Sequence, residues 1–367
     1  MKEITLDELK ALQPEEYAYV DIRGEIAYSH GHIPGAICWN REDLPDRLPE
    51  GKKLIVYCSF GENSVPAAEN LEAQGYEAYS LKQGYKAWLM KYCEELSEEE
   101  LQKYERQMIL PQVGRKGQKK IKNARILIIG AGGLGAPAAL YLAGAGVGTL
   151  GIMDADNVSI SNLHRQIIHS LERVDMNKAE SAKMAIRNQN ELVRVETYPF
   201  FLTPDNAEEI IGDYDFIIDA ADNFETKFLI NDTCVLLKKP FCHGGILQFQ
   251  GQVMTYVPGD FPCYRCIFEE IPEKGSVPNC SQAGIIGAMA GIIGSIQALE
   301  AVKYVVGAGQ LLTGRLLIFD GFSMNMRVIR FEKKNAQCRV CGDKKDINNI
   351  KEHAGEYMQE ACLVKRG

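Results

Sequence analysis

A glycine-rich turn followed by an aspartate has the spacing of a nucleotide-binding site. The glycines follow the apolar residues 126–129 and are Gly130, Gly132, Gly133 and Gly135. Glycine lets the backbone turn tightly and approach phosphates, and the following helix offers free N–H groups to an anion. Asp154 ends a second apolar run, residues 149–153, where its carboxylate is placed to accept from ribose hydroxyls. The pattern predicts a site for ATP or a dinucleotide; a turn that only packs a helix against a sheet is the alternative.

Three charged residues further along the chain suit the phosphates of such a nucleotide. Asp222 follows a strand expected over residues 213–219, so it lies at the same sheet edge as the glycine turn. A carboxylate facing a triphosphate is a suitable Mg²⁺ ligand, usually through water. Arg165 and Lys178 would supply cations to the phosphates. Each residue taken alone is typical of an ordinary surface charge, but together they indicate a phosphate site.

Four of the eleven cysteines form two C-x-x-C pairs. The pairs are Cys263 with Cys266 and Cys338 with Cys341. Two such pairs in a chain with no sign of export predict a closed tetrahedral Zn²⁺ site with a structural role. Unliganded thiols or a redox couple are the alternatives.

Two further cysteines have the setting of reactive thiols. Cys58 ends a buried strand over residues 53–57 and precedes a loop and a helix, whose N–H groups favour the thiolate. A buried, inert cysteine is the alternative. Cys280 lies in a loop just ahead of a glycine-rich helix expected over residues 283–299, so its pKa is expected to be lowered. A packing cysteine is an equally good interpretation.

The elements that position these residues predict an α/β protein. Strands and helices alternate within residues 1–95, which predicts a small α/β domain. Ser97 and Glu100 form a capping box, so a new helix begins near Glu98 and carries Arg106. Residues 96–342 then form a Rossmann-like nucleotide-binding domain with the zinc site, and residues 343–367 form a tail.

Composition excludes several classes of function. The chain has 367 residues, 46% of them hydrophobic and 25% charged, which is ordinary for a globular protein of one to three domains. A formal net charge of −8 argues against a nucleic-acid-binding protein. The first residues lack the apolar core of a signal peptide, and residues 283–299 lack basic flanks, so we expect a cytoplasmic protein in which that segment is a buried helix.

The first ninety-five residues resemble the rhodanese family. The motifs Asp-Ile-Arg from Asp21, Gly-His-Ile-Pro-Gly-Ala from Gly31, the Cys58 loop and Gly-Tyr-x-x-Trp from Gly84 occur in that family's order. The resemblance implies a persulfide on Cys58. The loop departs from the family because Glu62 and Asn63 stand where a basic residue is common.

Residues 97–342 resemble the ThiF/MoeB/HesA family, relatives of the ubiquitin-activating enzymes. The match covers Arg106, the glycine turn, both cysteine pairs, Cys280, and a set of polar residues. The set is Asp154, Asp156, Asn162, Arg165, Gln166, Lys178, Asp222 and Asn223. The resemblance implies ATP-dependent adenylation of the C-terminal glycine of a ubiquitin-like sulfur-carrier protein that ends in Gly-Gly.

The resemblance also implies a role for each matched position. Asp154 would hold the ribose, and Asp222 the Mg²⁺. The phosphates would be held by Asn162, Arg165 and Lys178, with Asp156, Gln166 and Asn223 in the same nucleotide site. Arg106 would reach into the site of a second subunit, which implies a homodimer.

The fused rhodanese-like domain suggests a second half-reaction. A Cys58 persulfide, loaded by a donor such as a cysteine desulfurase, would attack the acyl-adenylate and give an acyl disulfide. A second thiol such as Cys280 would then release the thiocarboxylate; alternatively Cys280 takes the acyl group first as a thioester. Fused enzymes of this kind carry the rhodanese domain at the C-terminus, whereas here it stands at the N-terminus.

Two other functions compete with this interpretation. A nicotinamide-dependent oxidoreductase shares the glycine turn and the acid, but the chain has no Tyr-x-x-x-Lys pair. A non-catalytic scaffold would bind the carrier without forming AMP. The sequence does not decide which carrier or sulfur donor is used.

Overall fold

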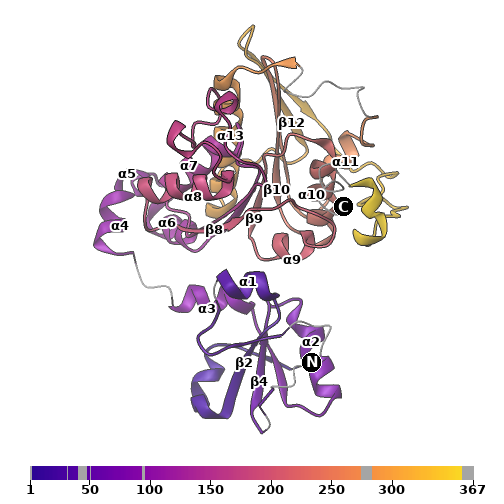
Figure 1. The fold of residues 1–367 in the computed structure, drawn as a ribbon. Coiled ribbons are helices and arrows are strands. Elements are labelled where there is room, and N and C mark those ends of the chain that lie inside the picture. The colour runs from indigo at the N-terminus through magenta and orange to yellow at the C-terminus, as the bar shows by residue number, and fades with distance from the viewer. Residues whose placement is uncertain are drawn as a thin grey trace. The chain divides into compact units, whose positions relative to one another are not determined.

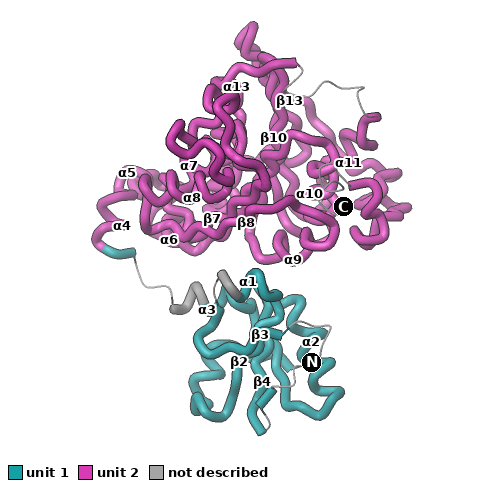
Figure 2. The backbone as a smooth tube through the Cα atoms, viewed as in Figure 1, with its two compact units in different colours: residues 1–97 teal, residues 98–367 magenta. Residues whose placement is uncertain are grey.

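The chain forms two compact units, Met1–Ser97 and Glu98–Gly367 (Figure 2). The structure is a computed structural model and describes residues 2–30, 32–39, 48–49, 51–92, 96–273 and 283–357. Each unit has its own sheet and its own apolar core.

The first unit is built on a five-stranded parallel sheet with the order β1-β5-β4-β2-β3. The strands are β1 (Glu3–Ile4), β2 (Tyr17–Asp21), β3 (Ile37–Cys38), β4 (Lys53–Tyr57) and β5 (Ala78–Leu81). The helices are η1 (Glu8–Ala11), η2 (Pro14–Glu16), α1 (Glu25–His30), α2 (Ser64–Ala73) and α3 (Gly84–Tyr92). The central strand β4 is buried from Leu54 onward, as its run of branched residues predicts.

The second unit is built on an eight-stranded sheet with the order β13-β12-β11-β10-β9-β6-β7-β8. The parallel strands are β6 (Arg125–Ile129), β7 (Thr149–Met153), β8 (Arg194–Tyr198), β9 (Phe216–Asp219) and β10 (Phe241–Leu247). The antiparallel strands are β11 (Gln250–Tyr256), β12 (Arg315–Asp320) and β13 (Asn325–Arg330). Strand order reverses between β6 and β9, and ligands bind at such a switch point in open α/β sheets.

Helices cover both faces of this sheet (Figure 1). The longer helices are α6 (Gly114–Lys122), α7 (Gly135–Ala145), α8 (Lys178–Gln189), α10 (Phe224–Leu236) and α13 (Gly287–Val306). The shorter helices are α4 (Glu98–Lys103), α5 (Glu105–Met108), η3 (Ile160–Asn162), η4 (Leu171–Arg173), α9 (Ala207–Gly212), α11 (Tyr264–Ile267) and η5 (Lys351–Glu356). Helices α7, α8 and α13 lie on one face, and α9 and α10 on the other.

Helix α13 is long and apolar enough to cross a membrane by length and composition alone. It packs against α7 and against strands β10 and β11, and half of its apolar stretch is buried in the second unit. Small residues allow this close approach, since a Cβ on Gly294 would lie 2.3 Å from the Leu134 carbonyl oxygen of α7's first turn. The helix is therefore packed in the core as the sequence indicated, but it spans Gly287–Val306, so the bounds expected from the uncharged stretch, residues 283–299, were wrong at both ends.

The single helix that the sequence predicted from Glu98 through Arg106 is divided into two helices in the structure. The helix that begins at Glu98 ends at Lys103, and Arg106 belongs to the separate helix α5. The break falls at Tyr104, whose buried ring packs against Gly146 and whose hydroxyl accepts a hydrogen bond of 2.8 Å from Asn190. The prediction of a continuous helix through Arg106 was wrong because this tertiary contact outweighs local helix propensity.

Candidate functional site

The glycine turn follows β6 and lies beside the carboxyl end of the neighbouring strand β9. Gly130 has φ +100°, and a Cβ there would meet the Ala220 carbonyl oxygen at 2.5 Å. A Cβ on Gly135 would stand 1.9 Å from the Gly130 carbonyl oxygen. Side chains at these two positions would push the turn apart, so glycine is required by the close approach of three backbone segments.

Asp154 fixes the turn from the end of β7. Its carboxylate accepts hydrogen bonds from the N–H of Ala131 at 2.8 Å and the N–H of Asp156 at 2.9 Å. Burial raises the pKa of Asp154 above its ordinary value. The side chain thus orders the backbone of the turn and keeps lone pairs for a further donor, such as a ribose hydroxyl.

Lys178 begins α8 next to Asp154 and Asp156. Its buried amino group forms an ion pair of 2.9 Å with the exposed carboxylate of Asp156. Asn177 caps α8 by accepting from the N–H groups of Ala179 and Glu180, and its amide donates to the Asp154 carbonyl. The cap and the ion pair hold the Lys178 cation beside the glycine turn.

Arg165 and Gln166 lie over the other side of the turn. The Arg165 side chain passes within 3.6 Å of the Cβ position of Gly133, and the Gln166 amide lies 3.5 Å from that of Gly132. Asn162 accepts a hydrogen bond of 3.1 Å from Arg165, which orients the guanidinium. Gln166 is buried, and its Oε1 has no hydrogen-bond partner among the described residues. A buried acceptor left open here is suited to a ligand.

His169 supports the same turn, although no sequence motif predicts this role. Its Nε2 donates to the Ala131 carbonyl at 2.9 Å, and its Nδ1 accepts from the Ser181 hydroxyl at 2.8 Å. Burial lowers the pKa of His169 to about 4, so the imidazole is neutral. Its partners are a backbone carbonyl and a distant serine, which no sequence motif marks.

Asp222 and Asn223 follow β9, at the same sheet edge as the glycine turn. Asp222 is exposed, whereas Asn223 caps α10 by accepting from the Thr226 N–H at 2.8 Å. The structure therefore gives Asn223 a role in shaping the loop that presents Asp222. Arg106 is exposed on α5, with no hydrogen bond or ion pair described to the residues of the turn.

The four cysteines of the two C-x-x-C pairs come together although 71 residues separate the pairs. Their sulfur atoms all lie within 4.8 Å of one another. Neighbouring Sγ–Sγ distances are 3.8 Å for Cys263–Cys266, 3.6 Å for Cys263–Cys338 and 3.3 Å for Cys266–Cys341. Zn–S bonds of about 2.3 Å in a tetrahedron place sulfur atoms about 3.8 Å apart, so the donor set fits zinc.

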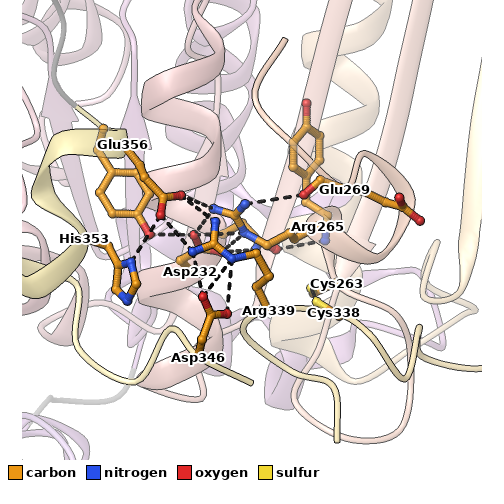
Figure 3. Close-up of polar contacts among 12 residues, drawn as sticks. Asp232, Cys263, Arg265, Glu269, Cys338, Arg339, Asp346, His353 and Glu356 are labelled. Carbon is orange, nitrogen blue, oxygen red and sulfur yellow. Dashed lines mark hydrogen bonds and ion pairs between the residues drawn. The ribbon is translucent and has the colours of Figure 1, made fainter. Parts of the chain in front are cut away.

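Each pair carries an arginine between its cysteines, and both arginines lie within ion-pair distance of Glu356, in the segment after the second pair, at 3.9 Å for Arg265 and 2.8 Å for Arg339 (Figure 3). Arg265 forms a buried ion pair with Asp232 of α10 at 2.5 Å. Arg339 pairs with Asp346 and with Glu356, each at 2.8 Å. Residues 343–357, which the sequence left without a role, are thus held against the cysteine cluster.

Cys58 lies in a shielded loop of the first unit. The Gly61 N–H donates to its Sγ at 3.1 Å, and Ser64 Oγ lies 3.6 Å away. The loop closes on the start of α3, where the Tyr85 N–H donates to the Cys58 carbonyl at 2.8 Å. One backbone N–H therefore points at the sulfur atom, and the reactivity of Cys58 stays a prediction. Cys280 lies outside the described residues.

Comparison with known proteins identifies the family. The ThiF family model matches residues 104–340, and the rhodanese-like domain model matches residues 5–91. The chain belongs to the ThiF family and carries an N-terminal rhodanese-like domain, which confirms both resemblances.

Two relatives show how far this likeness extends. The chain is 46% identical over 252 residues to the sulfur carrier protein adenylyltransferase of Thermus thermophilus, covering 67% of this chain and 93% of that protein. It is 41% identical over 298 residues to the adenylyltransferase and sulfurtransferase MOCS3 of Aedes aegypti, covering 81% of this chain and 66% of that protein. The chain spans 54% to 66% of the length of the MOCS3 relatives that it matches.

Solved structures agree with the fold. PaaA matches with a TM-score of 0.56 and 27% identity, over 65% of this chain and 75% of that one. Escherichia coli MccB, crystallised with ATP, matches with a TM-score of 0.58 and 20% identity, over 65% and 74% of the two chains. The α/β fold class predicted from the sequence is confirmed.

Proposed function

We propose that this protein uses ATP to adenylate the C-terminal glycine of a ubiquitin-like sulfur-carrier protein that ends in Gly-Gly. Membership of the ThiF family and the high coverage of the Thermus sulfur carrier protein adenylyltransferase support this activity. The two activities named for MOCS3 match the pairing of a ThiF domain with a rhodanese-like domain in this chain.

The observation that carries the proposal is the arrangement of charge around one glycine turn. Arg165 lies over the turn and Lys178 stands beside it, each held by a neighbouring side chain. The nucleophile is a carboxylate with a pKa of about 3.5, so it is ionised at neutral pH and needs no general base. The barrier is the approach of one anion to another, which fixed cations and backbone N–H groups lower.

Asp222 is the proposed ligand for Mg²⁺. Asp222 is exposed and follows Ala220, whose carbonyl oxygen would lie 2.5 Å from a Cβ on Gly130. Oxygen ligands from one or two carboxylates with several waters suit this ion. Bound Mg²⁺ would neutralise charge on the leaving pyrophosphate. The fold holds the Asp222 carboxylate and the cations of Arg165 and Lys178 in place around the turn.

Pyrophosphate exchange with a panel of purified carriers tests the proposal. Carrier-dependent exchange and AMP release are expected in the parent protein and lost in Asp222→Ala and Arg165→Ala. Glu208→Ala and Lys119→Ala, which remove exposed charges from α9 and α6, are matched controls and should retain activity. AMP formation at the parental rate by Asp222→Ala and Arg165→Ala would contradict the mechanism. Carrier binding without AMP would support a scaffold instead.

Sulfur transfer is the proposed second step. The terminal sulfur of a Cys58 persulfide attacks the carrier's acyl-adenylate, AMP leaves, and a carrier–CO–S–S–Cys58 acyl disulfide forms. A second thiolate, for which Cys280 is the candidate, then attacks the Cys58 sulfur and releases the thiocarboxylate. The resulting disulfide needs an external thiol reductant, and a cysteine desulfurase is a suitable source of the persulfide.

The two steps can be separated by mutation. Cys58→Ser is expected to abolish thiocarboxylate formation while pyrophosphate exchange continues, because the adenylation residues are untouched. Cys38→Ser, in the same unit, is the control and should retain both reactions. Unchanged thiocarboxylate yield from Cys58→Ser with a persulfide donor would remove Cys58 from the scheme.

We also propose a homodimer in which Arg106 completes the partner subunit's site. Arg106 is exposed on α5. Mixing inactive Arg106→Ala with inactive Asp222→Ala should then restore part of the exchange activity, since one site of each mixed dimer has both residues. No restoration after subunit exchange would place Arg106 within its own site or outside the reaction.

A further inference from the structure

Three buried side chains that the proposed chemistry does not use lie beneath the loop that carries Asp222. Asp219 ends β9, Lys227 lies in the first turns of α10, and His243 lies in β10. Their exposed fractions are 1%, 7% and 1%. Charged groups buried this deeply are costly unless paired, so their contacts define what they do.

The carboxylate of Asp219 is the centre of the group. Lys227 Nζ lies 3.2 Å from both of its oxygens and also donates to the Gly244 carbonyl at 2.8 Å. His243 Nδ1 donates to the carboxylate at 2.7 Å, and the Gln252 amide lies 3.3 Å from His243 Nε2. The three side chains therefore join β9, α10 and β10 around one anion, with its charge balanced by Lys227.

The protonation states agree with this pairing. Burial opposes ionisation of Asp219, but Lys227 and His243 outweigh it and hold the pKa of the carboxyl below its ordinary value. Burial and the neighbouring ammonium group lower the pKa of His243, so the imidazole is neutral. The Asp219 carboxylate and the Lys227 ammonium group then face each other, so the three side chains add little net charge near Asp222.

The backbone on both sides of Asp222 is tied to this group. Asp219 accepts a hydrogen bond of 3.1 Å from the Ala221 N–H, and its own carbonyl accepts from Gln297 at 2.7 Å. On the other side, the Lys227 N–H donates to the Asn223 carbonyl at 3.3 Å. The loop of residues 220–223 is therefore anchored at its start by the Asp219 carboxylate and at its end by the helix that carries Lys227.

We infer that Asp219, Lys227 and His243 form a positioning cluster that holds Asp222 at the correct place for a divalent cation bound to the nucleotide. This inference rests on the proposed function of Asp222. The cluster acts through geometry, because its charges balance and Lys227 is turned toward Asp219 and Gly244.

Metal binding in the presence of a non-cleavable nucleotide tests the inference. Mn²⁺ replaces Mg²⁺, α,β-methylene ATP replaces ATP, and bound Mn²⁺ is measured by electron paramagnetic resonance on the full chain. Lys227→Met should weaken Mn²⁺ binding about 10-fold or more, the range typical for partners of metal ligands. Lys227→Arg keeps the cation and the donors and should restore most of the affinity.

A matched control separates positioning from stability. Arg125 begins β6 and is also buried and ion-paired, with Glu196 and Asp213, at the opposite end of the parallel strands. Arg125→Met should lower the melting temperature without changing Mn²⁺ affinity. His243→Gln is a milder second variant at the cluster and carries the test should Lys227→Met fail to fold.

The outcomes are distinct. Folded Lys227→Met and His243→Gln proteins that bind Mn²⁺ and nucleotide as the parent does would overturn the inference. A parent that binds Mn²⁺ with nucleotide but forms no AMP with any carrier would overturn the proposed function, and the binding comparison among variants would still decide the role of the cluster. A parent that binds no Mn²⁺–nucleotide complex would overturn both.

Discussion

The glycine turn permits a comparison of two substitutions three residues apart. In Gly135→Ala the new Cβ would lie 1.9 Å from the Gly130 carbonyl oxygen, and 3.2 Å from Ile128 Cγ2. In Gly132→Ala the nearest atom is the Gln166 amide nitrogen at 3.5 Å, an ordinary contact. The same added methyl group is therefore expected to damage folding at one position and to be tolerated at the other.

The expected size follows from the contacts. A carbon–oxygen contact normally requires more than about 3.3 Å, so the backbone at Gly135 must move by about 1.4 Å. Overpacking of this kind costs about 1–3 kcal/mol. For a unit of this size each kcal/mol lowers the melting temperature by about 2–4 °C, so a fall of about 2–12 °C is expected.

Gly132→Ala should show the opposite behaviour. Its melting temperature should stay within about 1 °C of the parental value because the methyl group meets no backbone. The methyl group would nevertheless stand on the half-buried face of the turn beside the open acceptor of Gln166. Nucleotide affinity should fall about 10-fold, equivalent to about 1.4 kcal/mol.

Differential scanning fluorimetry and calorimetric titration of α,β-methylene ATP provide the two measurements. A Gly135→Ala protein as stable as the parent would refute the steric reasoning. A Gly132→Ala protein that binds nucleotide with parental affinity would show that the phosphates do not approach this part of the turn.

Three further outcomes are expected. Atomic absorption should find one zinc ion per chain. Cys341→Ser should lose the zinc and show a large fall in melting temperature, whereas the control Cys58→Ser should keep it. Full zinc content in Cys341→Ser would exclude a four-cysteine site. Because the folded pKa of His169 (about 4) lies below the ordinary 6.5, the unfolded chain binds more protons between these values, so stability should fall by up to about 3 kcal/mol as pH drops from 6.5 to 4. His169→Gln should flatten that part of the denaturation profile, and an identical profile would remove His169 as the cause. Tyr357→Phe removes a buried hydrogen bond of 2.8 Å to Asp232 and should cost about 1 kcal/mol in urea denaturation. No loss would show that Arg265 and Asn231, the other donors to that carboxylate, satisfy it without Tyr357.

Much of the fold could be predicted because its signals are local. The strands at residues 53–57 and 149–153 have the bounds expected from their apolar runs, whereas the strand expected over residues 213–219 begins only at Phe216. Thr5 and Glu8, which lie three residues apart in one local turn, form the reciprocal hydrogen bonds of a capping box beside a 3₁₀ helix. The order of the strands was not predicted, because it depends on which strands pair across long stretches of the chain.

The candidate site was only partly visible in the sequence. Gly130, Asp154 and Asp222 stand where strands end, a position that a pattern of apolar runs reveals. Asp219 and His243 lie within strands, at positions that the sequence pattern predicts to be part of the core. They are 24 residues apart, so no local motif predicts the hydrogen bond between them. The role of the arginines inside the cysteine pairs could not be predicted either, because their acidic partners, Asp232 and Glu356, lie elsewhere in the chain.

The glycine-rich helix α13 has one further consequence. The hydropathy of such a helix does not by itself define its position along its axis. Gln297 donates to the carbonyls of Asp219 and Cys242, and one turn later Glu300 accepts from Thr255 and the Leu312 N–H. Any other alignment would strand these groups without partners, so two polar side chains specify the axial setting of a helix that its hydropathy leaves undefined.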